Sequence, residues 1–169
     1  MSLDSYYRPM DHLTLEQRSH VNFDHPESLD WEMIRRDVDA LSRGESIVEP
    51  VYLFERHTRA AETRLVEAAE YVILEGLFAL HDPHVRSLLD ASIFVFAPDG
   101  ICLERRIARD TIERGRTRES VLEQYALTVR PMAEAFVLPT RHFADLIVSG
   151  ENPLEESGRA VEQLLLQAA

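Results

Sequence analysis

The chain has 169 residues, of which 45% are hydrophobic and 28% charged, with a formal net charge of −12. This size fits one globular domain over residues 1–169, and the negative charge argues against binding to DNA or RNA, whose phosphates would be repelled over most of the surface. With no apolar run of membrane-spanning length, no apolar signal segment in residues 1–12 and a single cysteine, Cys102, we expect a cytoplasmic protein without a disulfide or a membrane partner.

Helical periodicity recurs through the chain, and capping residues mark several helix starts. Thr14 and Gln17 form a capping-box pattern. Asp30, Asp82 and Asp99 are N-cap candidates, and a proline at position 131 should kink or break the helix that contains it. The predicted helices lie within residues 12–21, 30–44, 82–89, 99–115 and 120–136, and a last helix is opened by Asn152 and Pro153.

Short apolar runs predict the strands. Residues 47–54 and 63–66 alternate as in a β-hairpin, which we expect to form an arm outside the core. Residues 71–74 are continuously apolar and short, as in a buried parallel strand, and residues 92–96 and 146–148 are predicted as two further short strands of this kind. Because such strands alternate with helices, the pattern predicts an α/β fold with a parallel sheet.

The segment from Cys102 to Arg118 is rich in arginine. None of the 18 basic residues of the chain is a lysine. Six of the 18 fall within this segment: Arg105, Arg106, Arg109, Arg114, Arg116 and Arg118. One interpretation is a solvated helix face with i,i+4 ion pairs, such as Arg106 with Asp110. The other is a phosphoryl-transfer lid, because Arg114 and Arg116 flank a glycine at a helix end, where guanidinium groups can bind phosphate oxygens in bidentate fashion.

Three further residues are ambiguous when each is taken alone. Glu75 follows a predicted buried strand, where parallel sheets place ligands and metals, but it could be a simple strand-ending acid. Asp4 could be a solvated acid near a chain end, and His57 a surface histidine. The seven histidines and the cysteine have no zinc-site spacing.

Taken together, these residues occur in seven ordered blocks, and from Asp4 to about Asn152 the chain resembles the uridine kinase (uridine/cytidine kinase) family within the phosphoribulokinase/uridine kinase group. The blocks are Asp-Ser-Tyr-Tyr-Arg (4–8), Asn-Phe-Asp-His-Pro (22–26), Pro-Val-Tyr-Leu-Phe (50–54) with His57 and Arg59, Ile-Leu-Glu-Gly (73–76), Arg-Arg-Ile-Ala-Arg-Asp-Thr-Ile-Glu-Arg-Gly-Arg (105–116), Glu-Gln-Tyr (123–125) and Val-Arg-Pro-Met (129–132).

The resemblance implies phosphoryl transfer from ATP or GTP to the 5′-hydroxyl of uridine or cytidine, as in pyrimidine salvage, on a P-loop kinase-like sheet with helices on both faces and a lid helix. Asp4 would accept the hydroxyl proton, Arg109 and Arg114 would face the transferred phosphate, and Glu75 with Asp4 would hold Mg²⁺. Asp24 and Arg106 would bind the ribose hydroxyls. The remaining substrate-binding residues would be Tyr7, Phe23, Tyr52, Phe54, His57, Arg116 and Gln124.

The chain departs from the family pattern in two ways. Leu53 replaces the acid usual between Tyr52 and Phe54, and we expect little effect because this side chain should point away from the base. More seriously, no Gly-x-x-x-x-Gly-Lys-Ser/Thr loop is present, so the first strand and the P-loop are missing. Because the P-loop binds the donor phosphates, we expect residues 1–169 to be inactive alone.

 Three explanations are open: the strands on either side of the missing strand close up, another element fills the gap, or the sequence is a truncated form of a longer gene product with residues 1–3 an artificial or misassigned start. We favour the third.

The missing strand has a structural consequence. In the family it lies between the strands that correspond to residues 71–75 and 92–96, so we expect unpaired sheet edges, marginal stability and self-association.

Two rival functions stay open: a non-catalytic nucleoside-binding pseudokinase or regulatory protein, and a kinase for a sugar phosphate, which would offer no ring for Tyr52, Phe54 and His57. The sequence leaves open the preferred base, the choice between ATP and GTP, and homo-oligomer formation.

Overall fold

The structure is a computed structural model that describes residues 1–168. The chain divides into two compact units, Met1–Leu89 and Asp90–Ala169. Within the described residues, no helix is both long and apolar enough to cross a membrane.

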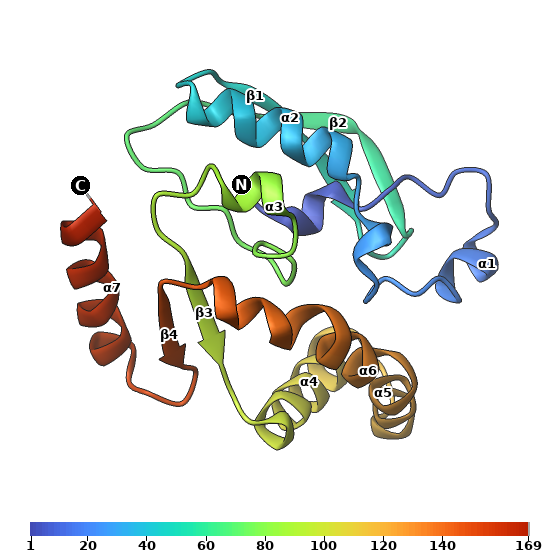
Figure 1. The fold of residues 1–169 in the computed structure, drawn as a ribbon. Helices are drawn as coiled ribbons and strands as arrows, with labels where there is room; N and C mark the ends of the chain where they lie inside the picture. The colour runs from blue at the N-terminus through green and yellow to red at the C-terminus, as the bar shows by residue number, and fades with distance from the viewer. Residues whose placement is uncertain (169) are drawn as a thin grey trace. The chain divides into compact units, whose positions relative to one another are not determined.

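The first unit combines short helices with an antiparallel hairpin (Figure 1). Its helices are α1 (Leu15–Ser19), α2 (Trp31–Ser42) and α3 (Pro83–Arg86), its strands are β1 (Ile47–Leu53) and β2 (Thr58–Val66), and 3-10 turns cover Leu3–Tyr6 and Pro26–Ser28. The predicted capping box of α1 is present, and Asp30 caps α2 by accepting a hydrogen bond from the Met33 amide. Asp82 caps α3, which ends three residues earlier than predicted.

The predicted hairpin is confirmed, with β1 antiparallel to β2. Its second strand begins at Thr58 rather than Thr63, and the register shifts between Pro50 and Tyr52, where proline has no amide hydrogen to donate. Helix α2 packs against β1, and the unit has an apolar core. The buried hydrophobic residues are Leu3, Tyr6, Leu29, Ile34, Val38, Leu41, Ile47, Tyr52, Phe78, Leu80 and Val85.

Residues 71–74 do not form the predicted buried strand. The side chains of Tyr71 and Ile73 are 70% and 78% exposed. The segment is held through its backbone: the Leu3 amide donates to the Glu75 carbonyl at 2.9 Å, and the Glu75 amide donates to the Met1 carbonyl at 3.1 Å. A buried strand needs partners on both edges, and among residues 1–168 this segment makes only an isolated parallel bridge, between Ser2 and Glu75.

The second unit is a parallel pair of strands with helices. Strands β3 (Ile93–Phe96) and β4 (Leu146–Ser149) pair in parallel, as the α/β prediction requires. Helix α4 (Asp99–Glu113) follows β3, and α7 (Leu154–Ala168) follows β4. Between them, α5 (Arg118–Gln124) and α6 (Arg130–Met132) alternate with π-helical turns at Tyr125–Val129 and Ala133–Val137, and a 3-10 segment covers Leu138–Phe143. The irregular hydrogen bonding thus flanks Pro131, where a break was predicted.

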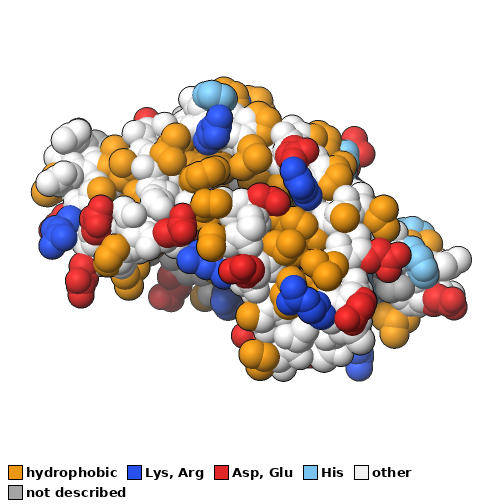
Figure 2. Space-filling view, turned by 90° about the horizontal axis from the view of Figure 1, so that it is seen from below, with side chains coloured by type: hydrophobic (Ala, Val, Ile, Leu, Met, Phe, Trp, Pro, Cys, Tyr) orange, Lys and Arg blue, Asp and Glu red, His pale blue; other side chains and the backbone are white. Residues whose placement is uncertain are grey.

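Two details of this unit correct the sequence prediction. Asp99 does not cap α4: Pro98 occupies the N-cap position, and the Asp99 carboxylate instead accepts a hydrogen bond from the Tyr125 hydroxyl at 2.6 Å. Strand β3 is not buried throughout, because Phe94 is buried while Val95 is 65% exposed. On the face drawn in Figure 2, hydrophobic side chains likewise lie open to solvent between charged groups. A two-stranded sheet leaves much of each strand uncovered.

Candidate functional site

Five aromatic rings from four segments of the first unit gather into one cluster, which we call the aromatic cluster: Tyr7, Phe23, Tyr52, Phe54 and His57. Ring centroids lie 5.1 Å apart for Phe23 and His57, which are stacked, and 5.6 Å apart for Tyr7 and Phe23. Tyr52 lies 5.2 Å from both Tyr7 and Phe54. Such rings offer flat apolar surface, which suits a planar ligand.

Local backbone geometry positions these rings. Tyr52 is near the end of β1 and Phe54 comes directly after the last residue of that strand, Leu53, and their rings are in contact. His57 is the last residue of the turn between the two strands and has a φ of 49°, in the left-handed region that few residues with a side chain adopt. Arg59 fixes the Tyr7 segment, because its guanidinium donates to the Tyr7 carbonyl at 2.9 Å and to the Tyr6 carbonyl at 3.1 Å.

A pocket of about 290 Å³ adjoins the aromatic cluster. It is lined by Ser2, Asp4, Ser5, Pro50, Val51, Tyr52, Phe54 and Arg64. Asp4 and Arg64 give this pocket one group of each charge. Arg64 is anchored by an ion pair with the fully buried Glu49, whose carboxylate also accepts a hydrogen bond from the Ser2 amide at 3.1 Å. The arrangement keeps a guanidinium and a carboxylate beside two of the aromatic rings.

Burial shapes the chemistry of two ring residues. Burial raises the pKa of Tyr52 to about 12, and among the described residues its buried hydroxyl has no hydrogen-bond partner. Burial also lowers the pKa of His57, and the positive charge of Arg18 adds to the effect. Near neutral pH His57 is therefore an uncharged imidazole that can both donate and accept a hydrogen bond.

The predicted magnesium residues come from neighbouring backbone segments. Asp4 follows directly after Leu3, whose amide bonds to the Glu75 carbonyl, and both acid side chains are exposed. Mg²⁺ is typically held by one or two carboxylates together with water and phosphate oxygens, so this donor pair fits the ion. Among residues 1–168 no group of three His, Cys, Asp or Glu side chains gathers as a metal cage.

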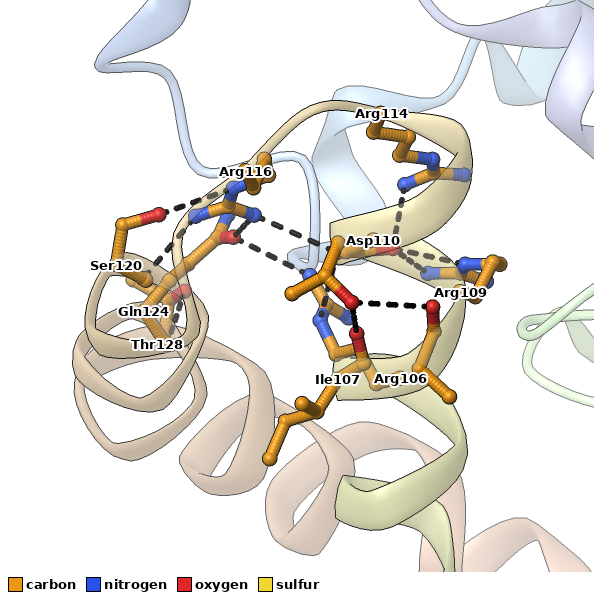
Figure 3. Close-up of polar contacts among 11 residues, drawn as sticks. Arg106, Ile107, Arg109, Asp110, Arg114, Arg116, Ser120, Gln124 and Thr128 are labelled. Atoms are coloured by element: carbon orange, nitrogen blue, oxygen red, sulfur yellow. Dashed lines mark hydrogen bonds and ion pairs between the residues drawn. The ribbon is translucent and has the colours of Figure 1, made fainter.

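In the second unit, four guanidinium groups surround one carboxylate (Figure 3). We call this set the arginine cluster: Arg106, Arg109, Arg114 and Arg116 around Asp110, whose side chain is fully buried. The Arg109 guanidinium donates to Asp110 Oδ1 at 2.8 Å. Four positive charges facing one negative charge leave an excess of positive charge, which favours an anionic ligand.

Gln124 connects two of these arginines to helix α5. Its Oε1 accepts hydrogen bonds from Arg116 and, at 3.3 Å, from Arg106. Arg116 also donates to the Ser120 hydroxyl at 3.3 Å and to the Ser120 carbonyl at 3.1 Å. The Arg116 backbone amide bonds to the Asp110 carbonyl at 3.1 Å across the turn at Gly115, whose φ is 62°. A glycine accepts this left-handed turn without steric cost.

The thirteen candidate residues are divided between the two units, and printed side-chain contacts join five of them in the aromatic cluster and another five in the arginine cluster with Gln124. The first unit holds Asp4, Tyr7, Phe23, Asp24, Tyr52, Phe54, His57 and Glu75, and the second holds Arg106, Arg109, Arg114, Arg116 and Gln124. Asp24 lies in the turn before Pro26, where its amide bonds to the Asn22 side chain at 3.1 Å. Asp24 and Arg106, predicted to share the ribose, therefore belong to different units.

Sequence reasoning did not assign roles to four residues that organise these groups: Arg18, Glu49, Arg59 and Arg64. Each acts over a long sequence separation, such as the 52 residues between Tyr7 and Arg59. The i,i+4 spacing did indicate an ion pair between Arg106 and Asp110, and Arg106 Nε lies 3.6 Å from Asp110 Oδ2. It could not show that three more arginines converge on the same carboxylate.

A solved structure shares the fold of this chain. A solved structure described as a fructose transport system kinase from Silicibacter sp. TM1040 matches with a TM-score of 0.68 and 24% identity, covering 88% of this chain and 73% of that one. This similarity supports the α/β fold of the P-loop kinases.

Comparison of sequences shows the family to which the chain belongs. The Phosphoribulokinase / Uridine kinase family matches residues 1–152. A uridine kinase from Shewanella amazonensis is 46% identical over 145 residues, which cover 86% of this chain and 68% of that protein. A uridine kinase from Aliivibrio fischeri is 47% identical over the same length, with 67% of that protein covered. The chain belongs to the phosphoribulokinase/uridine kinase family.

Proposed function

We propose that the chain carries the acceptor side of a nucleoside kinase, which transfers a phosphoryl group from ATP or GTP to the 5′-hydroxyl of uridine or cytidine. The proposal places it in pyrimidine salvage in the cytoplasm, with residues 1–169 as one kinase-like domain. The uridine kinases from Shewanella and Aliivibrio support the substrate class. The observation that carries the proposal is the aromatic cluster beside a pocket that Asp4 lines.

In this proposal the pyrimidine ring binds at the aromatic cluster. Phe54 stacks on the base, because its ring is 54% exposed and can still gain a partner. The buried Tyr52 hydroxyl, which has no partner within residues 1–168, and the neutral His57 imidazole supply polar atoms for the base. A sugar phosphate has no ring to cover these surfaces, so the aromatic cluster disfavours that substrate.

Asp4 accepts the proton of the 5′-hydroxyl, since a carboxylate at the pocket wall can take up a proton as the oxygen attacks. Asp4 and Glu75 would hold Mg²⁺, which when bound neutralises charge on the phosphates. Arg109 and Arg114 face the transferred phosphate, and their guanidinium groups stabilise its negative charge. Asp24, Arg106, Arg116 and Gln124 orient the nucleoside.

The test is calorimetric titration of the chain with uridine. We expect binding heat in the wild type and its loss in the double variant Asp24→Ala/His57→Ala, because the two residues contact the nucleoside from different segments. Tyr71→Ala serves as a control, since this exposed aromatic residue lies in the same unit and outside the aromatic cluster. Equal binding by wild type and double variant would contradict the proposed site.

A second candidate is a non-catalytic nucleoside-binding protein. Such a protein would use the aromatic cluster to bind the base without phosphoryl transfer. Fusing a family-typical strand and P-loop ahead of Asp4 distinguishes the two functions. Uridine-dependent turnover by the fusion supports the kinase, and nucleoside binding without turnover supports the second candidate.

A further inference from the structure

Asp110 has two carboxylate oxygens, and each faces a different pair of arginines (Figure 3). Oδ1 lies 2.8 Å from Arg109 and 3.5 Å from Arg114. Oδ2 lies 3.6 Å from Arg106 and 3.5 Å from Arg116. In the proposed function, the first pair faces the phosphate and the second pair orients the nucleoside. One buried carboxylate therefore joins the residues of two ligands.

We propose that Asp110 is a positioning residue that couples the binding of a phosphate anion to the binding of the nucleoside. The assignment of the two ligands rests on the proposed function, whereas the coupling between the two arginine pairs rests on the contacts of Asp110 alone. Asp110 acts through the arginines, because its side chain is fully buried and contacts no solvent.

Charge balance explains why the arginines depend on this carboxylate. The side chains of Arg109 and Arg114 are 44% and 50% exposed, so each could turn toward water, and the four guanidinium groups repel one another. The shared carboxylate offsets that repulsion and holds the groups within 3.6 Å of it. Without its charge, the favoured arrangement is one in which the exposed guanidinium groups separate.

The uneven contacts of the two oxygens give the coupling its sign. Oδ1 accepts a hydrogen bond from Arg109 Nε, whereas Oδ2 accepts none from the described residues and makes only ion pairs of 3.5 and 3.6 Å. A phosphate that binds Arg109 and Arg114 neutralises part of their positive charge and so weakens their attraction to the carboxylate. The carboxylate then holds Arg106 and Arg116 more closely, so phosphate should strengthen nucleoside binding, and nucleoside should strengthen phosphate binding by the same factor.

Substitution of the Asp110 side chain separates the coupling between the two arginine pairs from the backbone structure around Asp110. The backbone bond between the Arg116 amide and the Asp110 carbonyl does not involve the carboxylate, so it remains available in Asp110→Asn. Asp110→Glu keeps the charge and should restore part of the coupling. Glu104→Gln is the matched control, because it removes one negative charge from an exposed position on the same helix.

The experiment titrates uridine calorimetrically with and without saturating inorganic phosphate. We expect phosphate to tighten uridine binding by about fivefold or more in the wild type and in Glu104→Gln, as is typical of coupled sites. In Asp110→Asn the ratio should fall to about one, with an intermediate value in Asp110→Glu. A ratio unchanged by Asp110→Asn, or a wild-type ratio of one, would overturn the inference.

A second readout needs no nucleoside and separates this inference from the proposed function. In NMR spectra of the arginine Nε–H groups, phosphate alone should shift the Arg116 signal in the wild type but not in Asp110→Asn. Phosphate coupling seen at Arg116 in a chain that does not bind uridine would reject the proposed function and keep the inference. An Arg116 signal that phosphate leaves unmoved in the wild type would overturn the inference.

Arg109→Gln, Arg116→Gln and their double variant keep the test decisive if Asp110→Asn does not fold. Arg109 contacts Oδ1 and Arg116 contacts Oδ2, so each single variant removes one side of the coupling while Asp110 stays in place. We expect their effects on uridine affinity in the presence of phosphate to be non-additive. Additive effects would overturn the inference.

Discussion

The aromatic cluster and the arginine cluster are built in opposite ways. The aromatic cluster draws its rings from four separate segments, at Tyr7, Phe23, the end of β1 and His57, and tertiary packing assembles it. The arginine cluster comes from a single stretch, residues 106–116, in which helix geometry and one buried acid assemble it, and Gln124 connects it to α5. The first offers neutral flat surfaces, and the second offers excess positive charge.

This difference separates two kinds of recognition within the chain. A stacked base is read by shape and by a few polar atoms, so the aromatic cluster depends on the core that positions its segments. An anion is read by charge, which acts over longer distances and tolerates small displacements. Changes to the core of the first unit should therefore impair base binding more than anion binding.

The largest effect that we predict concerns what both clusters lack. With ATP or GTP and Mg²⁺, residues 1–169 should form no uridine 5′-monophosphate above a no-protein control, because neither cluster supplies a phosphate-cradling loop or a lysine. Chromatographic detection of the product checks this. Turnover that disappears in Asp4→Asn would show that the aromatic and arginine clusters suffice for catalysis.

The comparison also explains what the sequence could predict. The arginine cluster was visible as a local run with i,i+4 spacing, and the hairpin and most helix starts followed from alternation and capping residues. The grouping of the aromatic rings came from the family resemblance, because Tyr7 and Tyr52 have no local pattern that joins them. Residues 71–74 were predicted as a buried strand because an apolar run reports propensity, whereas burial also requires partner strands that periodicity does not reveal.

A stability measurement should sharpen the contrast between two buried acids, Asp37 and Asp110. The Tyr6 hydroxyl donates to Asp37 Oδ2 at 2.9 Å inside the core of the first unit, and burial together with this bond raises the pKa of Tyr6. Tyr6→Phe should lower the free energy of unfolding by about 1.5–3 kcal/mol, as expected for a lost hydrogen bond to a charged group. Urea unfolding measures this, with Tyr71→Phe as an exposed control.

The same variant tests the independence of the arginine cluster. Phosphate affinity should be unchanged in Tyr6→Phe under conditions where the chain is folded, since Asp110 draws its partners from residues 106–116 alone. A parallel loss of phosphate binding would contradict the division between a core-dependent cluster and a locally assembled one.

A smaller effect should distinguish a ring that binds ligand from a ring that supports the fold. Phe54→Ala should weaken uridine binding by about 1–3 kcal/mol, the range for loss of a base–aromatic stack, while the stability of the chain changes little because the ring is more than half exposed. Calorimetry and urea unfolding give the two quantities. Lost stability with retained uridine affinity would assign Phe54 to packing instead.

The smallest effect that we predict is a pH dependence confined to the first unit. Burial, and then the charge of Arg18, lower the pKa of His57 in the folded chain below its usual value of about 6.5. Between the folded and the ordinary pKa the unfolded chain binds more protons, so the stability that His57 contributes is complete above about pH 6.5 and is lost as the pH falls toward the folded pKa.

His57→Asn removes this titration while keeping a residue that tolerates the left-handed φ of 49°. The difference in unfolding free energy between wild type and His57→Asn should therefore shift against the wild type on acidification. A difference that stays constant with pH would show that the His57 imidazole is as well solvated when folded as when unfolded, and that the stacked contact with Phe23 does not bury it.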